Sequence, residues 1–112
     1  MLQNPTQEAY TADQILRRAV DKSLDDIILA CVDLAALLLR IKKRTIPKTY
    51  KEIILATHEF IGALALKIAP LTSCRNETIH QYMKLNWENI KTVRNAKEDI
   101  LLFVNKIIAA SA

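Results

Sequence analysis

One long stretch, from Gln14 to about Lys43, constrains the fold of this chain more than any other. Apolar residues recur in it at spacings of three and four, which is typical of an amphipathic helix. The apolar seam consists of Val20, Leu24, Ile27, Cys31, Leu34, Leu38 and Ile41, and the other sides carry Ile28, Val32, Ala35, Ala36 and Leu39. A helix that is apolar on nearly every side cannot be covered by one neighbour, so it must lie between several elements or in a subunit interface.

The ends of this first helix follow from local patterns. Thr11-Ala12-Asp13-Gln14 has the form of a capping box, in which the first residue is the N-cap and Gln14 reaches back to it. Tyr10 and Ile15 flank the box and can form a hydrophobic staple. At the other end, Pro47 disfavours a helical conformation at Ile46, so a turn is expected there.

A shorter second helix is expected next. Thr49 and Glu52 form a second capping box, which opens a helix from Tyr50 to about His58. Gly62, the only glycine, predicts a break near residues 58–62, although a packing glycine inside a continuous helix is the alternative.

A third helix should run from about residue 63 to residue 83, with a kink or a division at Pro70. Asn86 can cap a last helix that starts at Trp87 and ends near Ala109. The expected core stripe of that last helix is Ile90, Val93, Ile100, Val104 and Ile107. For Trp87, a packing anchor is favoured over a base-stacking platform.

Composition agrees with a helical protein. The 112 residues are 51% hydrophobic and include one Gly and three Pro, which suits helices better than a turn-rich sheet. We therefore predict one all-α domain over residues 1–112, an antiparallel bundle of four to five helices, with residues 1–10 as an N-terminal extension. Because a chain of this size cannot enclose its first helix, we expect at least a dimer.

Other features of the sequence indicate a cytoplasmic protein. The first residues lack the pattern of a signal peptide, and the longest apolar run, residues 27–39, is too short to span a bilayer. Asp33 interrupts that run, and we expect it to be a buried carboxylate paired within the fold. Cys31 and Cys74 have no CxxC spacing, which predicts buried or free thiols in a reducing compartment, with no metal site and no cofactor.

The most informative polar stretch runs from Arg75 to Tyr82 and reads Arg-Asn-x-x-x-His-x-Tyr. Arginine grips phosphate through two hydrogen bonds, and histidine can give or take a proton near neutral pH. On a helix, Arg75 and Tyr82 share one stripe and Asn76 and His80 share the next, because successive residues turn by about 100°. Two such helices about a two-fold axis would face each other across a cleft.

This stretch resembles the signature of HEPN ribonucleases, and in particular the HEPN toxins of HEPN–MNT toxin–antitoxin modules, often called HepT. The flanks agree, with Pro47 to Glu52 and Leu71 to Cys74 before the motif and a Trp-led last helix after it. The resemblance covers about Gln14 to Ile108. The family usually has another helix before this region, whereas only about ten residues precede the first helix predicted here.

The resemblance implies a homodimeric toxin that cleaves RNA, with tRNA as one candidate, without a metal. His80 would act as general base or general acid, Arg75 would neutralise the phosphate, and Asn76 would orient the phosphate or the imidazole. The products would carry a 2′,3′-cyclic phosphate. The family further implies that a nucleotidyltransferase (MNT) antitoxin attaches adenylate to Tyr82. The residue-level alternative for Tyr82 is packing against Trp87 and the last helix.

A basic segment surrounds the first turn between helices. The net charge of +4 is mild, but six cations fall within twelve residues, namely Arg40, Lys42, Lys43, Arg44, Lys48 and Lys51. They form either a solvated loop or a surface that binds RNA phosphates beside the cleft, with the first five as the candidate RNA-binding residues.

Three other functions are alternatives. The chain could be a non-catalytic helical partner of a minimal nucleotidyltransferase, or a helical bundle that only mediates assembly. His58 lies in a stretch similar to the phosphotransfer motif H-x-L-K-G. Ile61 stands where that motif has lysine, so an ordinary helix-end histidine is favoured.

Overall fold

The computed structural model describes residues 6–74 and 83–112. All regular secondary structure in these two ranges is helical, which confirms the all-α prediction. The helices are α1 (Gln7–Ala12), α2 (Gln14–Ile41), α3 (Tyr50–Ala56), α4 (His58–Ile61), α5 (Leu64–Ile68), the 3-10 helix η1 (Ala69–Cys74), α6 (Met83–Asn95) and α7 (Lys97–Ser111). None of the described helices is both long and apolar enough to cross a lipid bilayer.

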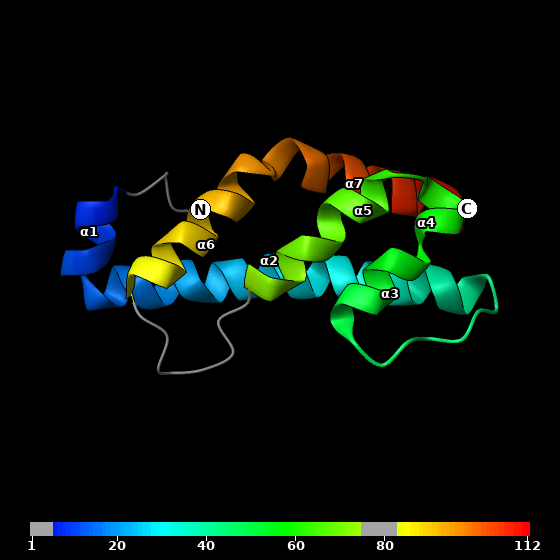
Figure 1. The fold of residues 1–112 in the computed structure, drawn as a ribbon, viewed down its shortest axis with the longest axis horizontal. Helices are drawn as coiled ribbons and strands as arrows, with labels where there is room; N and C mark the ends of the chain where they lie inside the picture. The colour runs from blue at the N-terminus through cyan, green and yellow to red at the C-terminus, as the bar shows by residue number, and fades with distance from the viewer. Residues whose placement is uncertain (1–5, 75–82) are drawn as a thin grey trace.

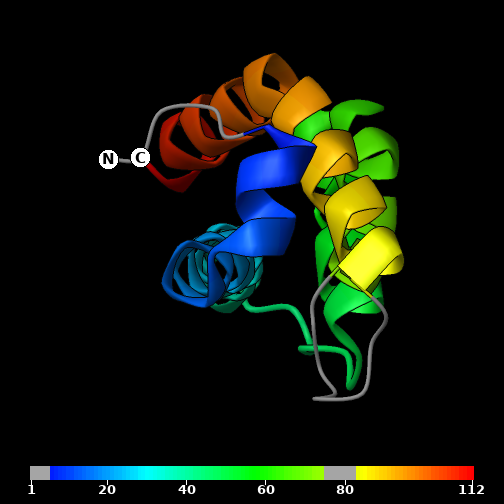
Figure 2. The same cartoon turned by 90° about the vertical axis from the view of Figure 1, so that its left-hand side faces the viewer.

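Helix α2 runs along most of the length of an elongated bundle that measures 47 × 25 × 19 Å (Figure 1). After the turn that follows α2, helix α3 leads to α4 near the end where α2 finishes, α5 and η1 return along α2, and α6 and α7 run forward again (Figure 1). Seen end-on, α2 and α7 lie on one side of the bundle and α3 to α5 on the other (Figure 2). Helix α2 packs against α7, α3, α6 and α1, so several neighbours cover it, as its composition requires.

The N-terminal end differs from the prediction. Thr11 lies inside α1, so it is not the N-cap of the long helix. Asp13 is the N-cap instead, because its Oδ1 accepts hydrogen bonds from the backbone N–H groups of Ile15 at 2.9 Å and Leu16 at 3.1 Å. The predicted staple is also absent, since Ile15 is 81% exposed while Tyr10 is buried. The six-residue helix α1 thus occupies part of the predicted extension.

The middle of the chain follows the prediction closely. Helix α2 ends at Ile41, and the Oγ1 of Thr49 accepts a hydrogen bond from the backbone N–H of Glu52 at 3.2 Å, which caps α3. Gly62 ends α4 with a φ of 82°, a conformation that glycine adopts without strain, so the break predicted there is confirmed. Pro70 lies in η1, where the α-helical pattern gives way to a 3-10 helix.

The prediction for the last helix is wrong in two respects. The helix begins at Met83, so position 86 lies inside α6 and Asn86 does not precede the helix. It is also divided at Ala96, which separates α6 from α7. The local break at Ala96 carries no glycine or proline, and this is why the sequence alone did not indicate it.

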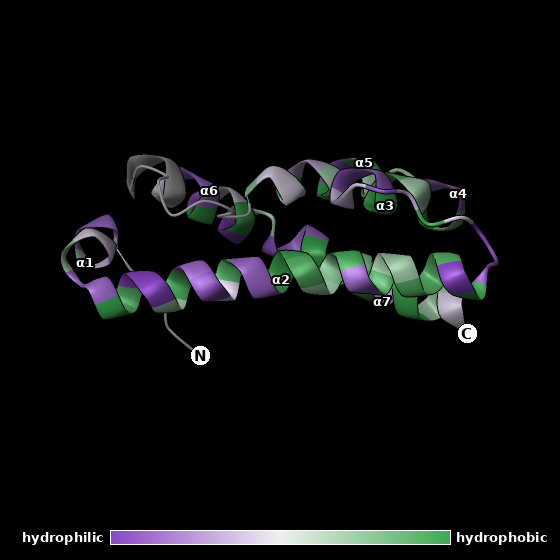
Figure 3. Cartoon of the chain, turned by 90° about the horizontal axis from the view of Figure 1, so that it is seen from below, coloured by the Kyte–Doolittle hydropathy of each residue, from purple (hydrophilic) through white to green (hydrophobic). Residues whose placement is uncertain are grey.

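The core combines residues from all of these helices (Figure 3). The largest residues with almost no exposed surface are Tyr10, Phe103, Leu38, Leu39, Ile54, Ile68, Ile107 and Thr57. Within the predicted stripe of the last helix, Ile90, Val93 and Ile107 are buried, while Ile100 and Val104 are half-buried.

The seam of α2 is buried only in part. Its residues Val20, Leu24, Cys31 and Leu38 are buried, whereas Ile27 and Ile41 are exposed. Asp33 is exposed as well, so the prediction of a buried carboxylate is wrong. Asp33 lies on the outer side of α2, because Asp26 and Arg40, each seven residues away on the same helix face, are also exposed.

Candidate functional site

The predicted catalytic and modified residues Arg75, Asn76, His80 and Tyr82 lie outside the described residues. Their arrangement about a cleft therefore stays a prediction. The structure does describe the two segments that flank them: η1 ends at Cys74, and α6 begins at Met83.

The segment before the motif is held by the core and by local hydrogen bonds. Leu71 and Cys74 of η1 are buried. The hydroxyl of Thr72 donates to the carbonyl of Ala69 at 2.8 Å, and the hydroxyl of Ser73 donates to the carbonyl of Pro70 at 2.8 Å. These contacts anchor the chain directly before Arg75.

The segment after the motif is anchored through Trp87. Its indole is 5% exposed and lies 5.4 Å from the ring of Tyr10, measured between centroids, and the Arg94 guanidinium lies 5.3 Å from the Trp87 ring. The hydroxyl of Tyr10 in turn donates a hydrogen bond of 2.7 Å to Asp21 of α2. Trp87 is therefore a packing anchor, as predicted, and its burial leaves no open face for a base.

The role of Tyr10 in this anchor was not predicted from the sequence. Helix α1 packs on both α2 and α6, and its buried tyrosine joins the two. The available signal was an aromatic residue just before a capping motif, but that pattern indicated a local staple instead of a contact with a residue far along the chain.

The basic segment lies between α2 and α3. Arg40, Lys43, Arg44 and Lys48 are exposed, and Lys42 is half-buried. Lys43 adopts a φ of 58°, and the backbone N–H of Arg44 donates to the carbonyl of Leu39 at 2.8 Å, which turns the chain back at the end of α2.

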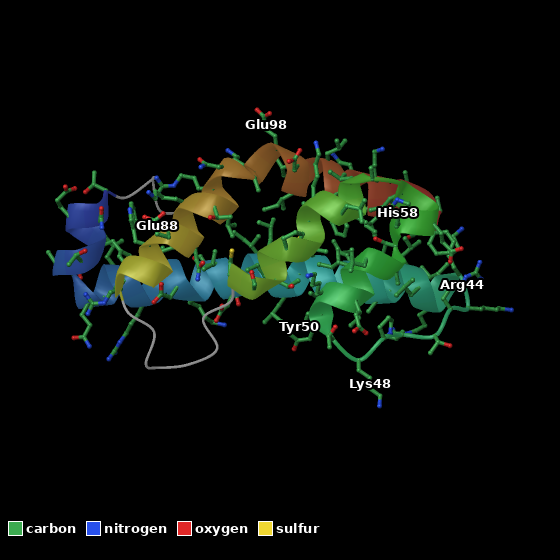
Figure 4. All side chains as sticks on the ribbon, viewed as in Figure 1. Arg44, Lys48, Tyr50, His58, Glu88 and Glu98 are labelled. Carbon is green, nitrogen blue, oxygen red and sulfur yellow. The ribbon has the colours of Figure 1, made fainter. Side chains whose placement is uncertain are left out.

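This turn brings two of the five cations together on one aromatic ring. The Nζ of Lys42 lies 5.8 Å and the Cζ of Arg44 lies 5.4 Å from the centroid of Phe60. The Nε of Arg44 also donates to Glu59 at 2.8 Å, and this hydrogen bond and the charge of Glu59 raise the pKa of Arg44. Lys48 lies apart from this cluster and extends away from the helices (Figure 4).

The basic segment and the start of α6 lie toward opposite ends of the molecule. Arg44 and Lys48 lie at the end where α2 finishes, whereas α6 begins near the other end (Figure 4). Within one chain, the basic segment is therefore distant from the residue that follows the motif.

The two cysteines are buried and form no disulfide. Burial raises the pKa of Cys31 from its ordinary value of 9.0 to about 11 and also raises the pKa of Cys74. Both thiols are therefore protonated near neutral pH and unsuited to nucleophilic catalysis. Over residues 6–74 and 83–112, no group of three or more His, Cys, Asp or Glu side chains could hold a metal ion.

A family model described as "Ribonuclease HepT-like" matches residues 1–107. The chain belongs to the HepT-like ribonuclease family. This confirms the resemblance recognised in the motif and its flanks. The match also includes residues 1–13, so α1 and its anchor on Trp87 fall within the family region. No curated protein and no solved structure matches the chain. Membership in a ribonuclease family implies RNA as the substrate.

Proposed function

We propose that the chain is the toxin of a toxin–antitoxin module, a metal-independent endoribonuclease that acts as a homodimer. The observation that carries the proposal is the combination of the family match with Arg75, Asn76, His80 and Tyr82 retained together in one stretch. A chain that only bound a nucleotidyltransferase would have no need of an arginine, an asparagine and a histidine at these spacings.

The proposed chemistry is an internal transfer of the phosphodiester. The ribose 2′-oxygen attacks the phosphorus as its proton is removed, and the bond to the 5′-oxygen breaks as that oxygen gains a proton. His80 of one subunit or its partner supplies one of these proton transfers. Arg75 stabilises the charge that grows on the phosphoryl oxygens, and Asn76 orients the phosphate or the imidazole. The products are a 2′,3′-cyclic phosphate and a 5′-hydroxyl.

A strip on the outer face of α2 supports the homodimer. Exposed or half-buried small and apolar residues recur at alternating spacings of three and four: Ile27, Ala30, Leu34, Leu37 and Ile41. This is the pattern by which two helices pack side by side. In an antiparallel pair of α2 helices, Leu34 would meet the partner's Leu37, and Asp33 would lie beside the partner's Arg40. Oppositely charged neighbours would then flank the apolar seam.

The position of this strip favours an interface that sets the motif of one subunit beside the basic segment of the other. Ile27, at one end of the strip, lines a small cavity together with Leu71 and Thr72 of η1. The strip therefore starts beside the helix that leads directly into Arg75. In the antiparallel pair, this end of the strip would lie opposite the partner's Ile41, so the residues before the motif would face the end of the partner's α2.

A ribonuclease assay tests the catalytic proposal. His80→Ala and Arg75→Ala should each lower the cleavage rate by roughly 10²–10⁴-fold, because each removes an acid–base group or a charge clamp. The chain offers matched controls. His58 is the other of the two histidines, and both His58 and Arg18 are exposed. Their alanine variants should retain activity. EDTA should have no effect, and mass spectrometry should detect the cyclic phosphate.

Two results would contradict this proposal. Activity lost in EDTA and restored by a divalent metal would exclude the metal-independent mechanism. An absence of cleavage by the purified chain, together with tight binding to a nucleotidyltransferase, would favour a non-catalytic partner instead.

We propose further that an MNT antitoxin silences the toxin at Tyr82. The phenol oxygen would attack the α-phosphorus of ATP, lose its proton, and release pyrophosphate. The attached phosphate would compete with RNA for Arg75, and the nucleoside would fill space that the substrate needs. Tyr82→Phe should keep most nuclease activity and escape silencing.

Co-expression with a nucleotidyltransferase followed by intact-mass spectrometry tests this step. Adenylate-sized additions should appear on the parent and on Tyr50→Phe, a control at an exposed tyrosine of α3, and should vanish in Tyr82→Phe. A silenced but unmodified protein would point to inhibition by binding alone.

A further inference from the structure

Helix α4 and the last turns of α7 come together at one end of the bundle (Figure 1). A shallow hollow lies between them. It has a volume of about 360 Å³ and is lined by Phe60, Ile61, Lys106, Ala109 and Ala110. The hollow is open to solvent along most of its surface, so it suits one part of an extended ligand better than an enclosed small molecule. The small alanine side chains leave the space open, and the one charged residue in the lining is a cation.

The aromatic ring of the hollow also touches the basic segment. Phe60 lines the hollow, and the side chains of Lys42 and Arg44 lie close to the same ring. Arg44 is held in place by the carboxylate of Glu59 and by a hydrogen bond of 3.1 Å from its Nη1 to the carbonyl of Lys42. The hollow therefore joins an aromatic surface with three cations, of which Lys106 comes from a different helix.

The turn that sets up this arrangement is strained. Lys43 adopts a left-handed conformation at a φ of 58°, where glycine is the residue without a steric cost. Without this turn the chain after α2 would continue away from α4, and Arg44 would not reach Phe60. Strain of this kind tends to persist where the surrounding structure has a use for it.

We propose that this Phe60 hollow binds one nucleotide of single-stranded RNA, with the base against the part of the Phe60 ring that lines the hollow and the neighbouring phosphates on Lys42, Arg44 and Lys106. The proposal rests on the proposed ribonuclease function, because it assigns a contact to the same RNA away from the site of cleavage. An aromatic ring beside a basic track is the combination with which proteins hold unpaired bases. Lys43 and Lys48 extend the basic track from the hollow along the exposed turn.

Binding of a labelled single-stranded oligoribonucleotide, followed by fluorescence anisotropy, tests the proposal. The full-length chain is used with His80→Ala in every sample, so that the RNA is not cut. Phe60→Leu keeps an apolar side chain but removes the ring, and it should weaken binding roughly fivefold or more. Circular dichroism and the thermal midpoint check that the fold is retained.

Lys106→Gln gives a second variant that does not disturb the core, because Lys106 is exposed. It should lower the slope of log affinity against log salt by about 0.7, the value for one phosphate contact to a single strand. Lys97→Gln removes the same charge from the start of α7, also at an exposed position, and should leave both affinity and slope unchanged. RNA carrying 5-iodouridine should cross-link to Phe60.

Three outcomes would overturn the proposal. Affinity of Phe60→Leu within twofold of the parent would exclude stacking. Equal losses in Lys106→Gln and Lys97→Gln would show that total charge, and not this hollow, governs binding. Competition by polyglutamate as effective as by unlabelled RNA would indicate an acidic protein partner. RNA binding that depends on Phe60 and Lys106 without cleavage by the unmutated chain would uphold the hollow and refute the nuclease. Cleavage by the unmutated chain, together with normal RNA binding by Phe60→Leu and Lys106→Gln, would uphold the nuclease and refute the hollow.

Discussion

Replacing Tyr10 by phenylalanine should weaken the fold measurably, although it removes a single oxygen atom. Tyr10 is 0% exposed, and its hydroxyl donates a 2.7 Å hydrogen bond to the carboxylate of Asp21. A hydrogen bond to a charged group contributes about 1.5–3 kcal/mol. Because Asp21 is half-buried and can regain water, we expect a loss near the lower end, about 1.5–2 kcal/mol. The ring and its contact with Trp87 are retained.

Urea denaturation monitored by tryptophan fluorescence measures this loss directly. Trp87 is the only tryptophan, and its indole lies against the Tyr10 ring. The thermal midpoint should fall by roughly 6–12 °C for a domain of this size. All variants are compared at one protein concentration, since association adds to apparent stability.

A double-mutant cycle with Asp21→Ala separates the hydrogen bond from other effects. The two changes should be coupled by about 1 kcal/mol or more, because each removes one partner of the same contact. Tyr50→Phe, at an exposed tyrosine, should lower the free energy of unfolding by less than Tyr10→Phe does. A coupling energy near zero, or a loss for Tyr10→Phe no larger than that of the control, would refute the stabilising role assigned to the hydrogen bond between Tyr10 of α1 and Asp21 of α2.

Three further predictions address the turn, the interface and the buried thiol. Lys43→Gly should raise the free energy of unfolding by up to about 1 kcal/mol in urea titrations, because it relieves the left-handed conformation at φ 58°; a loss would show that no strain is stored there. Leu37→Glu should convert a dimer to a monomer in light scattering, whereas Leu101→Glu should not, although Leu37 is 42% and Leu101 55% exposed; a parent that is already monomeric would contradict the interface on α2. The raised pKa of Cys31 favours the protonated thiol in the folded state, so its contribution to stability is complete below about pH 9 and is lost as the pH rises toward 11. The loss of unfolding free energy between about pH 9 and pH 10.5 should therefore be smaller in Cys31→Ala than in the parent, and equal slopes would contradict this assignment.

Local chemistry determined much of the architecture. The spacing of apolar residues predicted α2 almost to its last residue, because helical periodicity depends on the chain itself. Thr49, Gly62 and Pro70 marked a cap, a break and a change of helix type, since their preferences come from their own side chains and backbones. The family was likewise recognised from the residue identities between Arg75 and Tyr82, and the family match agrees with it.

Tertiary structure decided which of the possible local arrangements formed and which apolar positions were covered. Thr11 and Asp13 could both cap a helix, and the packing of α1 through Tyr10 onto Trp87 left Asp13 in that role. Periodicity showed a wide apolar arc on α2 but could not tell which part of it the neighbouring helices would cover. For this reason Asp33 was predicted to be buried, whereas it is exposed. The contact of Arg44 with Phe60 depends on a turn and on residues far apart along the chain. Such contacts depend on how separate helices come together, a property that no single stretch of sequence carries.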